Sequence, residues 1–326
     1  MTKNGYCQDT VSIVIITYNQ SKYIFDTLES TRLQTYQNIE LIISDDCSTD
    51  DTVEICTAWL KKNSKRFFNT KIIISPQNTG TAINCNRGVN ASTGKWIKLL
   101  AGDDSLPPES VAEYIDFMTI EKCNICCCKL KLFGEDQNFI KKTEPDYNKF
   151  YTMIDKNFKY QKKMNARELF IPGPGLFFLK NLFDTVNGFD EKYPFAEEWP
   201  FTTKILNSGN KIFLLDKYLY NYRIHAGSLC RNELEWSQNK LGLNKRVFFD
   251  TKKYFYNKGF FVLLKSGDIL YAWHLFLVYW YLAIRYNSNQ RDFLFKCVKL
   301  VLIFSPLAYI KLIKRIIRFK LFIVPQ

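Results

Sequence analysis

Two apolar, strand-like segments of this chain each end in a pair of aspartates. Residues 39–44 and 96–101 are rich in β-branched and aliphatic side chains, which favour buried strands of this length. The pairs are Asp45-Asp46, directly after the first segment, and Asp103-Asp104, one glycine after the second. A fold that accommodates this chain must therefore bring strand ends and carboxylates together.

Other segments extend the same pattern. Strand-like runs cover residues 11–16 and 71–75, and a helix-like stretch covers 23–35. Strand and helix then alternate from residue 11 onwards, which predicts an α/β fold with a Rossmann-like, mostly parallel sheet flanked by helices. Ligands bind at the carboxyl ends of such strands, so we expect Tyr18 and the aspartates to line one crevice.

Adjacent carboxylates repel unless a cation or solvent offsets their charge. Hard cations such as Mg²⁺ or Mn²⁺ take oxygen ligands from one or two carboxylates together with substrate phosphates. Asp103 and Asp104 are therefore interpreted as a place where a metal holds a phosphorylated substrate. The alternative is a solvated turn or helix N-cap, since Ser105 follows.

The residue types at the strand ends suit a nucleotide sugar. Tyr18 could stack on a base, and Asp45, Asp46 or Asp103 could accept hydrogen bonds from a base or ribose. A dinucleotide site would need Gly-x-Gly-x-x-Gly after the first strand. Residues 17–22 contain no glycine, which argues against a dehydrogenase.

Several motifs together resemble family 2 glycosyltransferases. They cover about residues 10 to 230 in the family's order, and the ordered set is specific although each piece alone is weak. The motifs are residues 11–19, Asp45-Asp46-Cys47-Ser48-Thr49-Asp50, the block 78–96, Gly102-Asp103-Asp104, Gly188-Phe189-Asp190-Glu191 with Glu197-Glu198-Trp199, and residues 222–228.

The resemblance implies a GT-A fold, a nucleoside-diphosphate sugar donor and an inverting transfer. Tyr18 would pack on uracil, in a motif that also contains Thr17 and Asn19. Asp46 would hydrogen-bond the uracil with Asp45 beside it. The nucleotide site would further include Arg87, for which a surface arginine is the alternative, and Asp103.

The resemblance also implies a metal and diphosphate site. Asp104 would bind Mn²⁺ or Mg²⁺, and Asp103 would contact the ribose or the metal. His225 or Ser228 would approach the metal or diphosphate, and Arg223 could neutralise phosphate charge. A structural histidine is the alternative for His225.

An inverting transfer needs one carboxylate that deprotonates the acceptor hydroxyl. The position that matches the family's aspartate base is Glu198, and Glu197 is the second candidate. A helix N-terminus, where acids favour the dipole, explains this pair equally well. The two interpretations are compatible, because a helix start can also orient a base.

Positive charge is concentrated at one end of the chain. The net charge is +13, and residues 231–326 contain 17 Lys and Arg against 5 Asp and Glu. Residues 269–284 are apolar and aromatic, and cations recur at helical spacing at Lys311, Lys314, Arg315 and Arg318. This pattern favours a helix on an anionic membrane surface over a packed helical subdomain or a nucleic-acid site.

The N-terminal residues 1–10 are polar and lack the apolar core of a secretory signal. The expected location is therefore peripheral, at the cytoplasmic face of the inner membrane, where most of the ten cysteines would be reduced thiols. Residues 123–128 contain four cysteines, but alternation along a strand would prevent four ligands from converging. The Lys-rich segment 134–167 is interpreted as an excursion between the two halves of the site that could order over substrate.

The sequence thus predicts a catalytic domain over residues 1–230 and a basic, membrane-associating helical region over 231–326. The predicted function is metal-dependent transfer of a hexose from a UDP-sugar to a lipid-linked saccharide, in O-antigen or capsule assembly. The alternatives are a non-catalytic nucleotide-sugar-binding protein and a membrane-surface scaffold.

Overall fold

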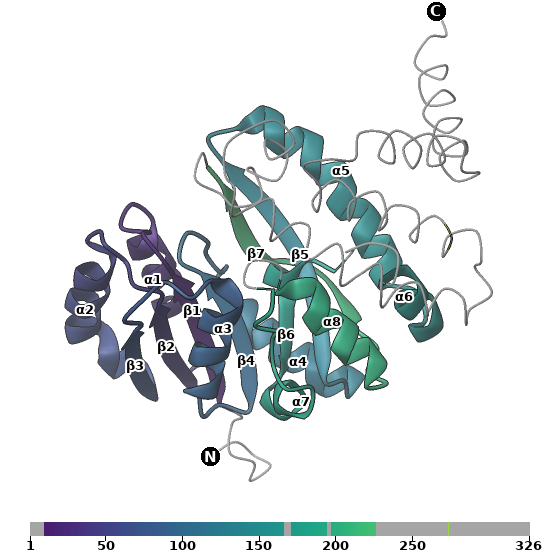
Figure 1. Cartoon of the computed structure of the whole chain (residues 1–326), viewed down its shortest axis with the longest axis horizontal. Coiled ribbons are helices and arrows are strands. Elements are labelled where there is room, and N and C mark those ends of the chain that lie inside the picture. Colours follow the sequence, from purple (N-terminus) through teal and green to yellow (C-terminus); the bar gives the residue numbers. More distant parts are fainter. Residues whose placement is uncertain (1–9, 166–170, 194–196, 226–272, 274–326) are drawn as a thin grey trace, which may run out of the picture. The chain divides into compact units, whose positions relative to one another are not determined.

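The computed structural model describes residues 10–165, 171–193, 197–225 and 273 of the 326 residues (Figure 1). Residues 163–165 and 273 apart, these all belong to one compact unit. Ser228 and the basic tail lie outside the described residues, except for Trp273. The domain boundary at residue 230 therefore stays a prediction.

Seven strands form a single sheet. They are β1 (Val11–Thr17), β2 (Ile39–Asp45), β3 (Asn69–Ile74), β4 (Trp96–Ala101), β5 (Ile125–Gly134), β6 (Leu176–Leu179) and β7 (Phe213–Ile224). Their order across the sheet is β3-β2-β1-β4-β6-β5-β7. Strands β1 to β4 pair in parallel, and β5 and β7 also pair in parallel. The mostly parallel α/β sheet expected from the sequence is confirmed.

Helices cover this sheet (Figure 1). They are α1 (Ile24–Arg32), α2 (Thr52–Asn63), α3 (Thr81–Asn90), α4 (Ser110–Glu121), α5 (Gln137–Ile154), α6 (Phe158–Asn165), α7 (Lys180–Thr185) and α8 (Glu198–Asn207), with short 3-10 turns η1 (Ser64–Arg66) and η2 (Gly173–Gly175). Every residue of β2 is buried, as expected for a strand covered on both faces. This explains why the apolar runs of the central strands are continuous rather than alternating.

Close packing of α3 on the sheet depends on Gly88. A Cβ at Gly88 would lie 2.4 Å from Cγ1 of Val14 in β1, so any larger residue would push the helix outwards. The helix contacts both β1 and β2. Its N-terminal turn is thereby held next to the ends of these strands, where the site residues lie.

Strand β6 is the exception to the parallel arrangement. It runs antiparallel to β4 and to β5, with Lys98 opposite Phe177 and Trp96 opposite Leu179. The start of β6 therefore lies at the edge where the parallel strands end. The reversed direction brings the preceding turn, residues 172–175, to the functional edge of the sheet.

The segment predicted as an excursion is largely helical where it is described. It contains α5 and α6, and α5 contacts β5 and β7. Asp136 caps α5 by accepting a hydrogen bond from Phe139 N at 2.9 Å, and Tyr151 and Ile154 are buried. An apolar stripe within a Lys-rich composition is enough to form a packed helical layer.

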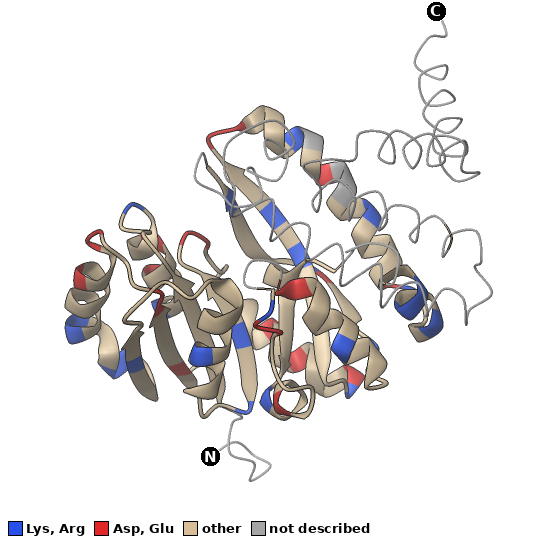
Figure 2. Cartoon of the chain, viewed as in Figure 1, with Lys and Arg blue, Asp and Glu red and all other residues tan. Residues whose placement is uncertain are grey.

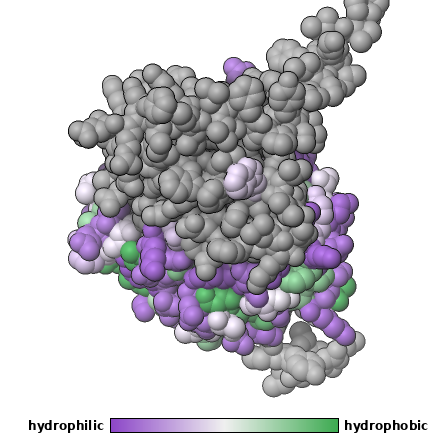
Figure 3. Space-filling view, turned by 45° about the vertical axis from the view of Figure 1, so that its right-hand side comes forward, coloured by the Kyte–Doolittle hydropathy of each residue, from purple (hydrophilic) through white to green (hydrophobic). Residues whose placement is uncertain are grey.

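Acidic and basic residues are both spread over the described part of the chain (Figure 2). The face shown in Figure 3 is mainly hydrophilic where it is described, with small hydrophobic areas between. Within the described part of the chain, no helix has the length and apolar character needed to cross a membrane.

Candidate active site

The strand directions bring the predicted site residues to one edge of the sheet. Strands β1, β2, β4 and β7 all end at this edge, and β6 begins there. The loop after β4 is tied to β7 by a bridge, in which Asn221 N donates to Ser105 O at 2.9 Å. Chain segments more than 100 residues apart thus form one surface.

Tyr18 lies on a fixed loop with its ring accessible. It is 44% exposed, and the next residue, Asn19, has a left-handed φ of 51°. Asn19 Oδ1 accepts from Thr49 N at 2.8 Å, and Asn19 N donates to Ser48 Oγ at 2.8 Å. These bonds join the loops after β1 and β2. A held, exposed aromatic ring is suited to stacking on a nucleobase.

Thr17 is buried beneath this loop. Its Oγ1 has no hydrogen-bond partner among the described residues. A Cβ at Gly102 would lie 2.7 Å from that oxygen, so the loop after β4 passes directly over it. Thr17 therefore packs between the first strand end and the aspartate pair.

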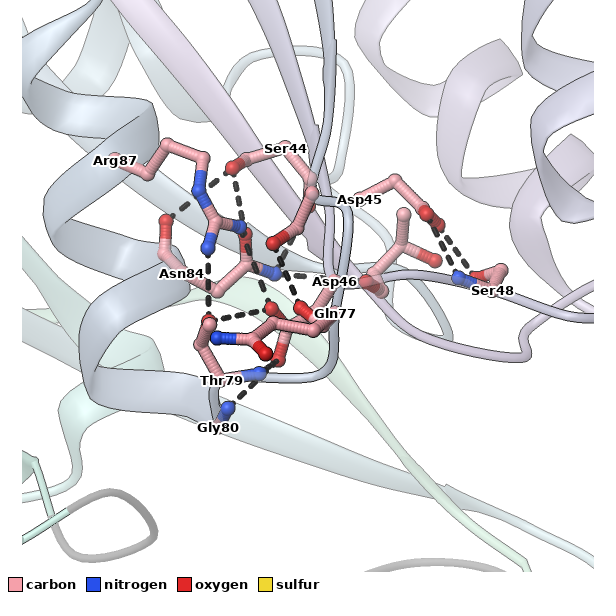
Figure 4. A network of polar contacts seen from close by, with 11 residues as sticks. Ser44, Asp45, Asp46, Ser48, Gln77, Thr79, Gly80, Asn84 and Arg87 are labelled. Atoms are coloured by element: carbon pink, nitrogen blue, oxygen red, sulfur yellow. Dashed lines mark hydrogen bonds and ion pairs between the residues drawn. The ribbon is translucent and has the colours of Figure 1, made fainter.

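Asp46 organises the start of α3 (Figure 4). Its Oδ2 accepts from the backbone N of Thr79 at 2.9 Å and of Gly80 at 2.7 Å, and its Oδ1 accepts from Thr79 Oγ1 at 2.6 Å. Arg87 Nη1 lies 3.3 Å from Asp46 Oδ1. The carboxylate is 3% exposed, so it holds the protein framework of the site together.

Arg87 belongs to the same network. It donates to Asn84 Oδ1 at 2.9 Å and to Thr79 Oγ1 at 2.8 Å, besides its ion pair with Asp46 (Figure 4). The Arg87 side chain is 20% exposed, and its guanidinium is bonded within the protein. Arg87 supports the strand ends from α3.

Asp45 is fully buried and closes the loop after β2. Its Oδ1 accepts from Ser48 N at 2.8 Å, and its Oδ2 accepts from Ser48 Oγ at 2.5 Å. Between them Cys47 adopts a left-handed φ of 71°, a conformation that favours glycine. The loop keeps its shape although its central residue carries a Cβ.

Asp104 is enclosed by the protein. It is 1% exposed, its Oδ2 accepts from the Tyr220 hydroxyl at 2.7 Å, and its Oδ1 accepts from Arg223 N at 2.7 Å. Burial and the neighbouring charge of Asp103 raise the pKa of Asp104 well above its ordinary value. Both carboxylate oxygens are thus used to join the end of β4 to β7.

Asp103 faces a different environment. Its Oδ2 lies 2.9 Å from Nε2 of His225, and the two side chains are 17% and 10% exposed. A carboxylate oxygen and an imidazole nitrogen are both ligands that Mn²⁺ accepts, and the donor phosphates would complete the coordination. Among the described residues no group of three or more such ligands is found. Asp103 and His225 together fit a metal that is shared with a phosphorylated substrate.

Arg223 is held against the same pair. Its Nε donates to Asp103 O at 2.7 Å, and its Nη2 donates to Asp26 Oδ2 at 3.1 Å. The guanidinium lies 4.8 Å from the ring centre of Tyr23 and 4.7 Å from that of Phe133. Arg223 thus brings positive charge next to Asp103, with a fixed orientation.

The acidic pair lies where α8 begins. Glu198 is the first residue of the helix and Glu197 is its N-cap, as the helix-start interpretation expected. A Cβ at Gly173 would lie 2.3 Å from Glu198 Oε1, so the glutamate rests directly on the turn before β6. Burial raises the pKa of the Cys85 thiol, and the charges of Glu197, Glu198 and Asp46 add to this shift. The Cys85 thiol is therefore influenced by the charges of the acidic pair and of Asp46.

The structure adds residues that the motifs did not indicate. Tyr220 supports Asp104, and Lys98 lies fully buried in β4 behind the site. The cysteines at positions 126, 127 and 128 are buried in the sheet, and burial raises the pKa of their thiols. A lysine in the middle of an apolar strand was the one available signal for Lys98.

The chain is similar to known glycosyltransferases over most of its length. The family model described as glycosyl transferase family 2 matches residues 12–186. Glycosyltransferase GlyG of Streptococcus pneumoniae is 25% identical over 247 residues, which are 71% of this chain and 77% of GlyG. The chain spans 32% of glycosyltransferase GlyA from the same species, at 26% identity over 68% of this chain.

A third relative is the Escherichia coli UDP-Glc:alpha-D-GlcNAc-diphosphoundecaprenol beta-1,3-glucosyltransferase WfaP. It is 36% identical over 116 residues, which are 35% of this chain and 43% of WfaP. Because this match is short, it relates only part of the two chains.

Solved structures share the fold. Staphylococcus aureus TarS 1-349 in complex with UDP-GlcNAc has a TM-score of 0.56 at 18% identity, covering 85% of this chain and 73% of that one. The Pyrobaculum calidifontis mannosyltransferase PcManGT with GDP-Man and Mn²⁺ has a TM-score of 0.53 at 15% identity, covering 91% and 81%. The fold is therefore GT-A, and the chain belongs to glycosyl transferase family 2.

Proposed function

We propose that this glycosyltransferase moves a hexose from a UDP-sugar to a hydroxyl of a lipid-linked saccharide, with inversion and with a divalent metal. The observation that carries the proposal is the Asp103–His225 pair at the carboxyl edge of the sheet, 2.9 Å apart. The accessible ring of Tyr18 and the acidic start of α8 belong to the same edge region.

A uracil nucleotide suits the donor side. Tyr18 would stack on the base, while Asp45 and Asp46 would shape the loops around it through their bonds to Ser48, Thr79 and Gly80. Structural neighbours include TarS complexes with UDP and UDP-GlcNAc, and the name of WfaP specifies UDP-Glc. These names support UDP over other nucleotides, although PcManGT is a GDP-Man complex.

We assign the metal to Asp103 and His225, in place of the principal role first expected for Asp104. Both Asp104 oxygens already accept hydrogen bonds, from Tyr220 and Arg223, and the residue is buried. Asp104 would instead fix the loop that presents Asp103. When bound, Mn²⁺ or Mg²⁺ would supply positive charge that stabilises the departing diphosphate.

Glu198 would act as the base, with Glu197 as the second candidate. The Glu198 carboxylate takes the proton of the acceptor hydroxyl while that oxygen forms a bond to the anomeric carbon. The bond from this carbon to the diphosphate oxygen breaks at the same time, and UDP leaves with the electron pair. Arg223, fixed beside Asp103, would lower the energy of the charge that develops on the diphosphate.

The acceptor and the location rest on the relatives and the tail. WfaP is named for a diphosphoundecaprenol-linked acceptor, and TuaG of Bacillus subtilis is named for teichuronic acid biosynthesis. A lipid-linked unit of a surface polysaccharide, such as O-antigen or capsule, suits an enzyme whose residues 231–326 carry a net charge of +12. The anionic inner face of the inner membrane would then hold the enzyme near its substrate.

Calorimetry of UDP binding tests this function most directly. Wild type should bind UDP more tightly with Mn²⁺ than without it, and Asp103→Asn should lose that difference. Asp116→Asn, an exposed aspartate on α4, is the control and should behave as wild type. An unchanged Mn²⁺ effect in Asp103→Asn would exclude the assigned metal role. Binding without turnover of any UDP-sugar would favour the non-catalytic alternative.

A further inference from the structure

A buried lysine lies beneath the turn on which the side chain of the proposed base, Glu198, rests. Lys98 is 0% exposed and pairs with Phe177 across the β4–β6 ladder. Its Nζ donates to Pro174 O at 2.5 Å and to Leu176 O at 3.1 Å. Within the described part of the chain, no carboxylate is within ion-pair distance of this ammonium group. The charged group of Lys98 is therefore hydrogen-bonded to backbone carbonyls.

The turn needs donors of this kind. Pro172 and Pro174 have no N–H, so the turn has few backbone donors of its own. Gly175 N donates to Pro172 O at 3.1 Å, and the Tyr114 hydroxyl donates to Gly175 O at 3.2 Å. Lys98 supplies bonds to the carbonyls of Pro174 and Leu176, so the position of the turn depends on it.

A cation at this place is costly for the fold. Burial lowers the pKa of Lys98 to about 8, against the opposing effect of the Cys126, Cys127 and Cys128 thiols and of Asp104. The rings of Tyr114 and Tyr220 stabilise the ammonium group in part, with centroids 5.2 Å and 4.6 Å from Nζ. A methionine could fill a similar volume without the desolvation cost. Packing alone therefore does not explain a lysine here.

The same turn lies directly against the Glu198 side chain. A Cβ at Gly173 would come within 2.4 Å of Cγ and Cδ of Glu198, and within 2.3 Å of its Oε1. A shift of the turn towards or away from α8 would hence move the carboxylate directly. On its other side, Lys98 packs on Tyr220, which holds Asp104 next to the metal pair.

We propose that Lys98 is a positioning residue for transfer, which fixes the 172–175 turn and through it the distance of Glu198 from the metal-bound donor. This proposal rests on the proposed function, in which Glu198 is the base. Lys98 itself touches neither donor nor acceptor. Its removal should leave the nucleotide site intact and impair the chemical step.

The test compares Lys98→Met with wild type and with Lys71→Met, which removes an exposed lysine of β3. Calorimetry with UDP and Mn²⁺ gives the affinity and the number of competent donor sites. UDP release from UDP-glucose and UDP-GlcNAc, with a lipid-diphosphate-linked GlcNAc as acceptor and with water alone, gives kcat and KM. We expect unchanged UDP binding and stoichiometry in Lys98→Met. Its kcat should fall about tenfold to a hundredfold, the loss caused by a misplacement of about 1 Å.

A loss of kcat that merely follows a loss of UDP-binding sites would show that Lys98 only stabilises the fold, and would overturn the proposal. Unchanged kcat would overturn it as well. If Lys98→Met does not fold, Lys98→Arg, which keeps a cation with displaced donors, is judged by the same criteria. Failure of both variants to fold would assign Lys98 to stability alone.

A crystal structure of Lys98→Met with UDP provides a readout that needs no known donor sugar or acceptor. The 172–175 turn and the Glu198 carboxylate should both be displaced, and an unmoved turn would overturn the proposal. Glu198→Gln separates this result from the proposed function. Full turnover in Glu198→Gln would show that the base is assigned wrongly, whether or not Lys98 positions the turn.

Discussion

The Tyr220 hydroxyl donates to Asp104 Oδ2 at 2.7 Å, and the Tyr220 hydroxyl oxygen accepts a hydrogen bond from Ala101 N at 3.2 Å. One side chain of β7 thus holds both the last residue of β4 and the buried aspartate beyond it. Since Asp104 adjoins Asp103, this contact connects the edge strand β7 to the proposed metal ligand.

Tyr220→Phe should destabilise the protein and weaken metal-dependent donor binding. The change leaves Asp104 buried with one hydrogen bond fewer, which typically costs about 1–3 kcal/mol in the free energy of unfolding. Chemical denaturation measures this loss, and calorimetry with UDP and Mn²⁺ measures the effect on binding. Tyr218→Phe is the control, because Tyr218 is 52% exposed in the same strand. Equal stability of the two variants would contradict the role given to Tyr220.

Glu198→Gln should remove transfer while UDP binding is kept. A glutamine cannot take the acceptor proton, and the loss of a general base lowers kcat by about 10²–10⁴. Steady-state transfer assays with UDP-sugars measure kcat, and calorimetry shows whether the donor site is intact. Glu197→Gln tests the second candidate at the N-cap of α8. A larger loss in Glu197→Gln than in Glu198→Gln would exchange the two roles.

The sequence indicated the strands because their signals are local. Continuous apolar runs mark β1, β2 and β4, and the observed bounds differ from those expected by at most one residue. Aspartates at strand ends follow from the same pattern, since parallel strands end at one edge. The helix-start interpretation of the Glu197-Glu198 pair is likewise confirmed by α8.

The partners of each carboxylate could not be inferred in this way. Asp104 is bonded by Arg223 N, 119 residues later, and Asp46 by Gly80, 34 residues later. Such contacts depend on the order of the strands in the sheet, which has no local signature. The sequence therefore located the candidate site but did not distinguish its framework carboxylates from those facing the substrate.

Cys47→Gly should stabilise the loop after β2. Cys47 has a φ of 71°, and a left-handed conformation costs a residue with a Cβ about 1–2 kcal/mol. Glycine removes this cost but gains conformational freedom in the unfolded chain, so we expect a net increase of about 0.5–1 kcal/mol in the free energy of unfolding. Cys47→Ala, which keeps the Cβ, should show no such gain. Thermal and urea denaturation of wild type, Cys47→Gly and Cys47→Ala measures these differences. If the loop were unstrained, Cys47→Gly would be the least stable of the three.

Glu40 should make stability depend on acid pH. It is 0% exposed and accepts from Ser12 Oγ at 2.5 Å, Thr93 N at 2.7 Å and Asn69 Nδ2 at 3.1 Å. Burial raises the pKa of this carboxyl, but the hydrogen bonds together outweigh burial, and the pKa lies below its ordinary value of 4.5.

Because the folded-state pKa of Glu40 is below that of the unfolded chain, its contribution to stability is complete above the unfolded pKa. The contribution is lost as pH falls through the folded pKa, since the unfolded state then binds the proton more readily. Urea denaturation from about pH 7 to about pH 3 should show a steeper decline for wild type than for Glu40→Gln. Glu109→Gln, at an exposed position before α4, should decline as wild type does. Parallel curves for wild type and Glu40→Gln would mean that the buried carboxylate and its four hydrogen-bonding neighbours (Ser12, Asn69, Thr93 and Gly94) do not favour the charged form.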